Sequence, residues 1–209
     1  MPKGAKTILA EALDPLLPGF ERNRWTWNRK RNNLVQVIEI SGSKHRTGDM
    51  TIDWGVTPER WATLVYGEEL PMYSSSHCAV FGRLGDFGGG DRWWDLEQVR
   101  TAVPPDMHSL LFEHLLPFLQ RIDSPEQLLA LVRRGYRPPR RRSDPYLDEH
   151  GSPWLWSWPR TKVQHQFVEA VLLAFVEGAG AALAALEEIE GWERADDVAK
   201  RLRSGNPRT

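Results

Sequence analysis

Residues 20–56 alternate apolar and polar side chains over three short segments, and this alternation limits the fold more than any other feature of the sequence. The segments are RWTWNRK, NNLVQVIEI and GDMTIDWGV, and each has the two-residue period of a β-strand. Asparagine and glycine separate them, as tight turns require. The pattern predicts an antiparallel β-meander with one apolar face and one mixed face. HCAVFGR, residues 77–83, is a plausible fourth strand.

Helical periodicity flanks this predicted sheet. Residues 5–16 carry one apolar stripe, and the period returns beyond Asp106, where we expect Pro117 to kink or shorten the helix. In DSPEQLLALVRRGY, Ser124 is the expected N-cap and Gly135 the stop signal. These elements predict an α+β domain over residues 1–136, with an N-terminal helix, an antiparallel meander and helices packed on one face.

The last third of the chain is predicted to be an α-helical C-terminal extension. Residues 137–159 are rich in arginine, proline and tryptophan and are expected to form a linker or long loop. Within residues 160–209, a long apolar helix should begin near Lys162 and a terminal helix should cover Trp192 to Leu202. Small residues on the apolar helix permit close approach of another helix, either within the chain or in a second copy; they are Ala174, Gly178, Ala181, Ala182 and Ala185.

Charge and cysteine content limit the partners and sites that we expect for this protein. The 27 basic and 28 acidic side chains nearly cancel, so no global field attracts nucleic acid or an anionic membrane. The single cysteine, Cys78, excludes an internal disulfide and a cysteine-based zinc site, which favours a reducing compartment such as the cytoplasm. The longest apolar run, Val171 to Leu186, is shorter than the roughly 20 residues that span a bilayer. We predict no membrane association, cofactor or metal.

The string LVQVIEI…GDMTIDWGV…HCAVFGRLG…DRWWDL…LLPFLQRIDSPEQLLALV resembles a bacterial family known as domain of unknown function 4304. The resemblance covers residues from about 6 to 134, and its most specific elements are Trp93, Trp94, Leu96 and the step from Arg83 to Gly85. It implies an α+β fold with an antiparallel sheet. It implies no reaction and no catalytic residues, and the tail after Arg137 departs from it.

The stretch GGGDRWWDLEQ, which holds Asp91, Trp93 and Trp94, is either a ligand-binding loop or the connection between the sheet and the next helix. A phosphate loop would need Lys-Ser/Thr after the glycines, and DRWW follows instead. A tryptophan that packs between sheet and helices buries roughly 200 Å². We therefore expect at least one of the two indoles to lie in the core.

An acid–base site could form if His77 and Arg83 share a strand face with Asp49 and Asp53 on the neighbouring strand. The simpler interpretation is a hydrogen-bonded surface cluster, because proton transfer needs partners within hydrogen-bond reach. An enzyme with this His/Arg/Asp site on the sheet face remains one alternative function.

Two basic clusters suggest nucleic-acid binding as another alternative. ERNRWTWNRKR combines five positive charges with Trp25 and Trp27, whose alternation would place both rings on one strand face. Such a segment suits single-stranded nucleic acid, and it equally suits a hairpin whose tryptophans face the core. RRGYRPPRRR adds six arginines, among them Arg140, Arg141 and Arg142.

PWLWSWP spaces three more indoles at period two, at Trp154, Trp156 and Trp158. Exposed, they would offer a patch to a protein partner or a sugar; buried, they would tie the tail to the body of the protein. Because tryptophan and arginine are plentiful and both favour interfaces, we expect a non-enzymatic bacterial cytoplasmic protein-binding module. A specific version is an immunity-like protein that neutralises a toxin or effector.

Overall fold

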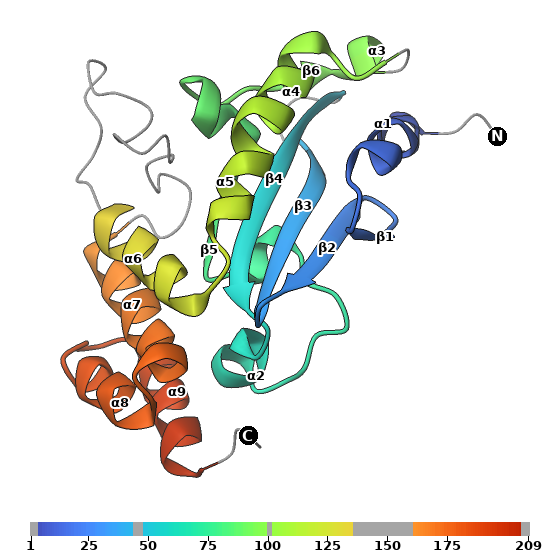
Figure 1. The fold of residues 1–209 in the computed structure, drawn as a ribbon. Helices are drawn as coiled ribbons and strands as arrows, with labels where there is room; N and C mark the ends of the chain where they lie inside the picture. The colour runs from blue at the N-terminus through green and yellow to red at the C-terminus, as the bar shows by residue number, and fades with distance from the viewer. Residues whose placement is uncertain (1–3, 44–47, 100–101, 136–160, 206–209) are drawn as a thin grey trace.

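A computed structural model of the chain describes residues 4–43, 48–99, 102–135 and 161–205. Its centre is an antiparallel sheet in the order β1-β2-β3-β4-β5, in which the short strand β6 also pairs with β4 (Figure 1). The strands are β1 Glu21–Asn23, β2 Thr26–Arg31, β3 Leu34–Gly42, β4 Asp49–Pro58, β5 Val80–Arg83 and β6 Trp94–Asp95. The predicted α+β class and antiparallel meander are confirmed.

Asn32 and Asn33 explain the hairpin between β2 and β3. Both have positive φ angles, 49° and 64°, and they join the paired residues Arg31 and Leu34. Asparagine tolerates this left-handed backbone better than most residues, and two such residues form the turn that matches the twist of a hairpin. The Asn-Asn pair therefore sets the register of the β2–β3 hairpin.

The segment RWTWNRK is not one strand. β1 and β2 are joined by a turn at Arg24 and Trp25, with Asn23 paired to Thr26 and Arg24 at a φ of 57°. The turn moves Trp25 out of the alternation that begins at Thr26. The expected shared face for Trp25 and Trp27 is therefore wrong.

The predicted fourth strand starts later than expected. Only Val80–Arg83 form β5, whereas His77 ends the short 3-10 helix η2, Ser75–His77. The His77 backbone N–H donates to Ser74 O at 3.1 Å, and the Cys78 N–H donates to Ser75 O at 3.0 Å. These local turn bonds replace ladder bonds and remove His77 from the sheet.

A long helical segment crosses one face of the sheet (Figure 1). It consists of α4 Pro105–Ser109, a π-helical turn Leu110–Leu115 and α5 Leu116–Arg121. Pro117 does not end the segment, which continues to Arg121, because the wider π-helical turn gives the proline ring room against the preceding carbonyls. The predicted helix that follows Ser124 is confirmed as α6, Pro125–Gly135.

The remaining helices of the N-terminal part are short. They are α1 Ala5–Leu13, with the 3-10 turn η1 Asp14–Leu16, then α2 Trp61–Tyr66, the 3-10 helix η3 Leu84–Gly88, and α3 Leu96–Val99. In Figure 1, β6 and α3 lie at one end of the sheet and α2 lies at the other.

Both faces of the sheet carry buried apolar residues. On the main core face, Trp54 of β4 packs edge-on against Phe118 of α5, with ring centroids 5.1 Å apart. On the opposite face, a smaller cluster contains Val35, Val37, Ala62, Tyr73 and Cys78. The covering is thus not confined to one face, because α2, η2 and the chain between them lie over part of the second.

The C-terminal helices share the main core. They are α7 Lys162–Val176, α8 Ala179–Glu187 and α9 Glu193–Arg203, and α7 contacts α6 while α9 contacts α2. The expected long helix is divided at Gly178, whose φ of 95° is unfavourable for residues with a side chain. Among the small residues, Ala182 is fully buried and Ala174, Ala181 and Ala185 pack against the core. In the described parts of the chain, every helix is too short or too polar to cross a membrane.

Candidate functional site

Trp93 and Trp94 have different surroundings. Trp94 belongs to β6, pairs with Met50 of β4 and is 4% exposed. Its indole Nε1 donates to both carboxylate oxygens of Asp106, at 3.1 Å each. Trp93 is only partly buried and packs against the Arg83 guanidinium, with the Cζ atom 5.0 Å from the ring centroid. One indole is thus part of the core, and the other belongs to the polar face.

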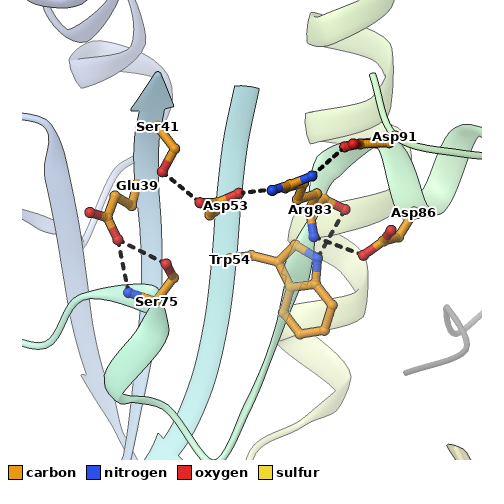
Figure 2. A network of polar contacts seen from close by, with 8 residues as sticks. All are labelled: Glu39, Ser41, Asp53, Trp54, Ser75, Arg83, Asp86 and Asp91. Carbon is orange, nitrogen blue, oxygen red and sulfur yellow. Dashed lines mark hydrogen bonds and ion pairs between the residues drawn. The ribbon is translucent and has the colours of Figure 1, made fainter. Parts of the chain in front are cut away.

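Arg83, the last residue of β5, is held by several neighbours (Figure 2). Its Nη1 donates to Asp91 Oδ1 at 2.7 Å, and its Nε lies 3.6 Å from Asp53 Oδ1. Its backbone is fixed as well: the N–H donates to Asp86 Oδ2 at 2.8 Å, and the carbonyl accepts from Trp54 Nε1 at 3.2 Å. The guanidinium therefore has little freedom beside Trp93.

Asp53 connects Arg83 to the middle of the sheet. The pairing places Glu39, Asp53 and Arg83 side by side on three adjacent strands. Ser41 Oγ donates to Asp53 Oδ2 at 2.5 Å, while Glu39 accepts from the N–H and Oγ of Ser75 at 2.9 and 2.8 Å (Figure 2). Burial raises the pKa of the Asp53 carboxyl, and the Ser41 hydrogen bond and the Arg83 charge offset this only in part.

The four residues predicted for acid–base chemistry do not meet. Asp53 and Arg83 form the ion pair, but His77 is bonded through Nδ1 to Ser74 Oγ at 2.9 Å and packs edge-on against Tyr66. Asp49 lies four residues from Asp53 along β4 and pairs with Asp95 of β6. Since extended chain advances about 3.3 Å per residue, Asp49 is too distant to share a proton with Asp53 or Arg83.

A hollow of about 530 Å³ opens beside the two tryptophans, lined by Asp91, Arg92, Trp93, Trp94, Gln98 and Asp106. Arg92 Nη1 lies 3.3 Å from Asp106 Oδ2, and Nη2 donates to Gly88 O at 3.4 Å. Asp91 and the two indoles were predicted from the sequence as binding residues, whereas Arg92, Gln98 and Asp106 were not. One signal was available for Asp106, because a buried indole N–H needs an acceptor. We name the group formed by Arg83, Asp91, Arg92, Trp93 and Gln98 the Trp93 surface.

The proposed platform of Trp25 and Trp27 for nucleic-acid bases does not form. Trp27 is fully buried, and its Nε1 donates to Asp14 Oδ1 at 3.0 Å. Trp25 is 40% exposed and has the Lys6 ammonium 4.8 Å from its ring centroid. The other predicted binding residues lie outside the described residues, namely Arg140, Arg141, Arg142, Trp154, Trp156 and Trp158.

Cys78 and the acidic residues offer no arrangement typical of metal or thiol chemistry. Cys78 is buried, and this burial raises the pKa of its thiol well above the usual value, so the thiol is neutral. Across the described ranges, no three His, Cys, Asp or Glu side chains gather as metal ligands would.

Comparison with known proteins gives a family match over the part of the chain that forms the sheet and the helices before α6. The model of the family described as domain of unknown function (DUF4304) matches residues 9–121, which include all six strands and the helical segment that ends at Arg121. No curated protein and no solved structure matches the chain. Helices α6 to α9 lie beyond the matched residues. The chain therefore belongs to the DUF4304 family, with a C-terminal extension outside the family match.

Proposed function

We propose that this protein is a non-enzymatic protein-binding module whose partner docks on the Trp93 surface. The observation that carries the proposal is the contact between Arg83 and Trp93, in which two acidic side chains hold the guanidinium beside a partly exposed indole. Tryptophan and arginine dominate the binding energy of many protein interfaces. A pair that is already fixed loses little conformational entropy when a partner binds.

The surroundings of Trp93 resemble an interface with an aromatic centre and a polar rim. The side chains of Asp91 and Arg92 are 54% and 44% exposed and flank the ring in the chain. The neighbouring hollow has room for a side chain of the partner. Two carboxylates, Asp91 and Asp106, line the hollow beside one arginine, Arg92. Electrostatic complementarity therefore favours a partner with a basic contact surface.

Neutralisation of a toxin or effector is the specific role that we propose within this class. Masking requires a rigid, preformed surface rather than a moving part or a reactive group, and the fixed Arg83 and Trp93 meet that requirement. We place the protein in the bacterial cytoplasm, a proposal supported by the free thiol of Cys78, the only cysteine in the sequence.

The experiment that tests the proposal is affinity capture from the native host with the full chain and two variants. Trp93→Ala removes the indole of the proposed interface, and Trp25→Ala removes an exposed indole that also lies beside a cation. We expect one stoichiometric protein with the wild type and with Trp25→Ala but not with Trp93→Ala. Equal capture by all three proteins, or no stoichiometric protein at all, contradicts the proposal.

If the captured protein is a toxin, its expression alone should arrest growth of a test strain. Co-expression of the wild type or Trp25→Ala should restore growth, and Trp93→Ala should fail to do so. Normal growth with the captured protein alone would overturn the neutralising role while leaving the binding site intact.

A further inference from the structure

Helix α8 lies at the outer edge of the molecule and is apolar on all sides (Figure 1). Its sequence, AGAALAALE, contains no polar side chain before Glu187. Ala182 and Leu186 are buried, on the side where α8 contacts α7 and α9. The outward residues are apolar too, namely Ala179, Gly180, Leu183 and Ala184. A helix that is apolar all round is normally buried, so this outward face is typical of an interface.

Two of the outward residues would let a second helix approach closely. Gly180 and Ala184 are four residues apart, lie on the same side of α8 and are both exposed. A Cβ atom at Gly180 would meet open space, so no described neighbour requires a glycine there. Glycine is also a poorer helix former than alanine. Because the side chains at the contact set the distance between packed helices, the pair favours a close helix crossing.

A groove of about 390 Å³ adjoins the beginning of this face. Its wall includes Gly178 and Ala179 at the start of α8, Phe175 of α7, Leu64 of α2 and Leu202 of α9. The groove extends the apolar surface toward α2 and shares no residue with the Trp93 surface. We name the four outward residues of α8 and this groove the α8 surface.

The two ends of the α8 surface carry opposite unpaired charges. Arg60 lines the groove beside the start of α8, and Glu188 is the C-cap at the other end; both are exposed. Neither forms an ion pair with any residue that the structure describes. Glu187 is already paired with Arg203 at 2.8 Å, and Glu177, before the helix, does not line the groove. The two ends therefore complement each other when a second copy lies antiparallel.

We propose that the α8 surface is an interface between two copies of this chain. The two α8 helices pack antiparallel across a two-fold axis, with Gly180 and Ala184 of each copy at the crossing. This arrangement brings Arg60 of each copy to Glu188 of the other and places the helix dipoles in favourable opposition. A second copy fits better than an unrelated partner, because one surface supplies both halves of the charge match. The proposal is independent of the protein-binding role of the Trp93 surface.

Sedimentation velocity of the purified full chain tests the proposal. Nine helical residues extend over only about 13 Å, so the contact belongs with the smaller, weaker class of interfaces. We expect a monomer–dimer equilibrium with a dissociation constant in the micromolar range.

Gly180→Gln and Ala184→Gln each place a long neutral side chain at the crossing. Each should weaken the dimer at least about tenfold. The isolated copy should keep its stability in urea, because both positions are exposed and glutamine is a good helix former. Ala130→Gln is the matched control, because Ala130 is exposed on another helix, α6. It should dimerise as the wild type does.

A charge exchange tests the antiparallel arrangement. Arg60→Glu and Glu188→Arg each set like charges against each other and should weaken the dimer at least about tenfold. The double variant restores the opposite charges and should dimerise nearly as well as the wild type. A wild type that stays monomeric at all concentrations would leave the α8 surface to a different protein and overturn the proposal. It is also overturned if Gly180→Gln dimerises normally, or if the double variant is no tighter than the single ones.

Discussion

Trp93 and Trp94 are consecutive in the chain, yet Trp94 donates to Asp106 from the core whereas Trp93 stacks with Arg83 on the polar face. Adjacent residues of an extended segment point to opposite sides of a sheet. The pairing of β6 with Met50 of β4 fixes which side each takes. Trp94 is thereby part of the core, whereas Trp93 lies on the proposed binding surface.

This division predicts different costs for the two alanine variants. Trp94→Ala should lower the free energy of unfolding by about 3–5 kcal/mol, because it leaves a cavity in the core. Trp93→Ala should cost about 1 kcal/mol, the worth of a partly exposed cation–π contact. Urea denaturation of both proteins measures this difference. Similar losses in the two variants would contradict the assignment of separate roles.

Asp53 should make stability depend on pH. Its raised pKa means that the folded protein keeps the proton to a higher pH than the unfolded chain does. Between the unfolded value of about 3.9 and the raised folded value, the folded state binds more protons, and stability falls as pH rises through this window. Asp53→Asn should remove this contribution, because the amide oxygen still accepts from Ser41 but does not titrate.

Urea midpoints of the wild type and Asp53→Asn, recorded from about pH 4 to pH 7, test this prediction. Asp91→Asn is the control, because it also removes a carboxylate from Arg83, but the Asp91 side chain is 54% exposed against 19% for Asp53. An unchanged pH dependence in Asp53→Asn would show that the buried carboxyl is not its source.

Gln36 should be essential for the contact between the sheet and the long helical segment. It is fully buried in β3, and its Nε2 donates to Leu119 O at 2.6 Å and Ile122 O at 3.1 Å, where α5 ends. Its Oε1 accepts from Arg29 Nη2 at 2.6 Å. Gln36→Leu leaves these groups unpaired and should cost at least about 2 kcal/mol. A loss under about 0.5 kcal/mol in urea denaturation would mean that water replaces the amide.

Arg201 should anchor the C-terminal extension. Its Nη1 donates to Leu64 O at 3.1 Å and Val65 O at 3.0 Å, two carbonyls in the last turn of α2. Arg201→Ala should lower stability by about 1.5–3 kcal/mol, the worth of hydrogen bonds to a charged donor. Arg203→Ala removes only an exposed ion pair with Glu187 and should cost about 0–1 kcal/mol. Equal losses would refute the anchoring role of Arg201.

Local sequence patterns predicted the meander, α6 and the terminal helix α9, because strand period, caps and helix period act over a few residues. They also predicted helix from Lys162 onward, but not its division into α7 and α8 at Gly178. The meeting of Asp53 and Arg83 also followed from alternation, once the two strands were taken as neighbours. Both predictions depend only on backbone periodicity and pairing.

The errors arose where turns or tertiary contacts decide the structure. Trp25 and His77 left the expected strands because two-residue and 3-10 turns interrupt the alternation. The π-helical turn before Pro117 was not predicted either, because no proline rule specifies that turn. The partnership of Trp94 with Asp106 joins segments twelve residues apart and depends on how the long helical segment crosses the sheet.

Site-specific photo-crosslinking in the native host tests the proposed binding surface most directly. A photoreactive residue at Gln98, in the hollow beside Trp93, should yield one discrete adduct. The same residue at the exposed Trp25, in the turn between β1 and β2, should yield none. An adduct that forms at Trp25 and not at Gln98 would contradict the account and place the partner elsewhere.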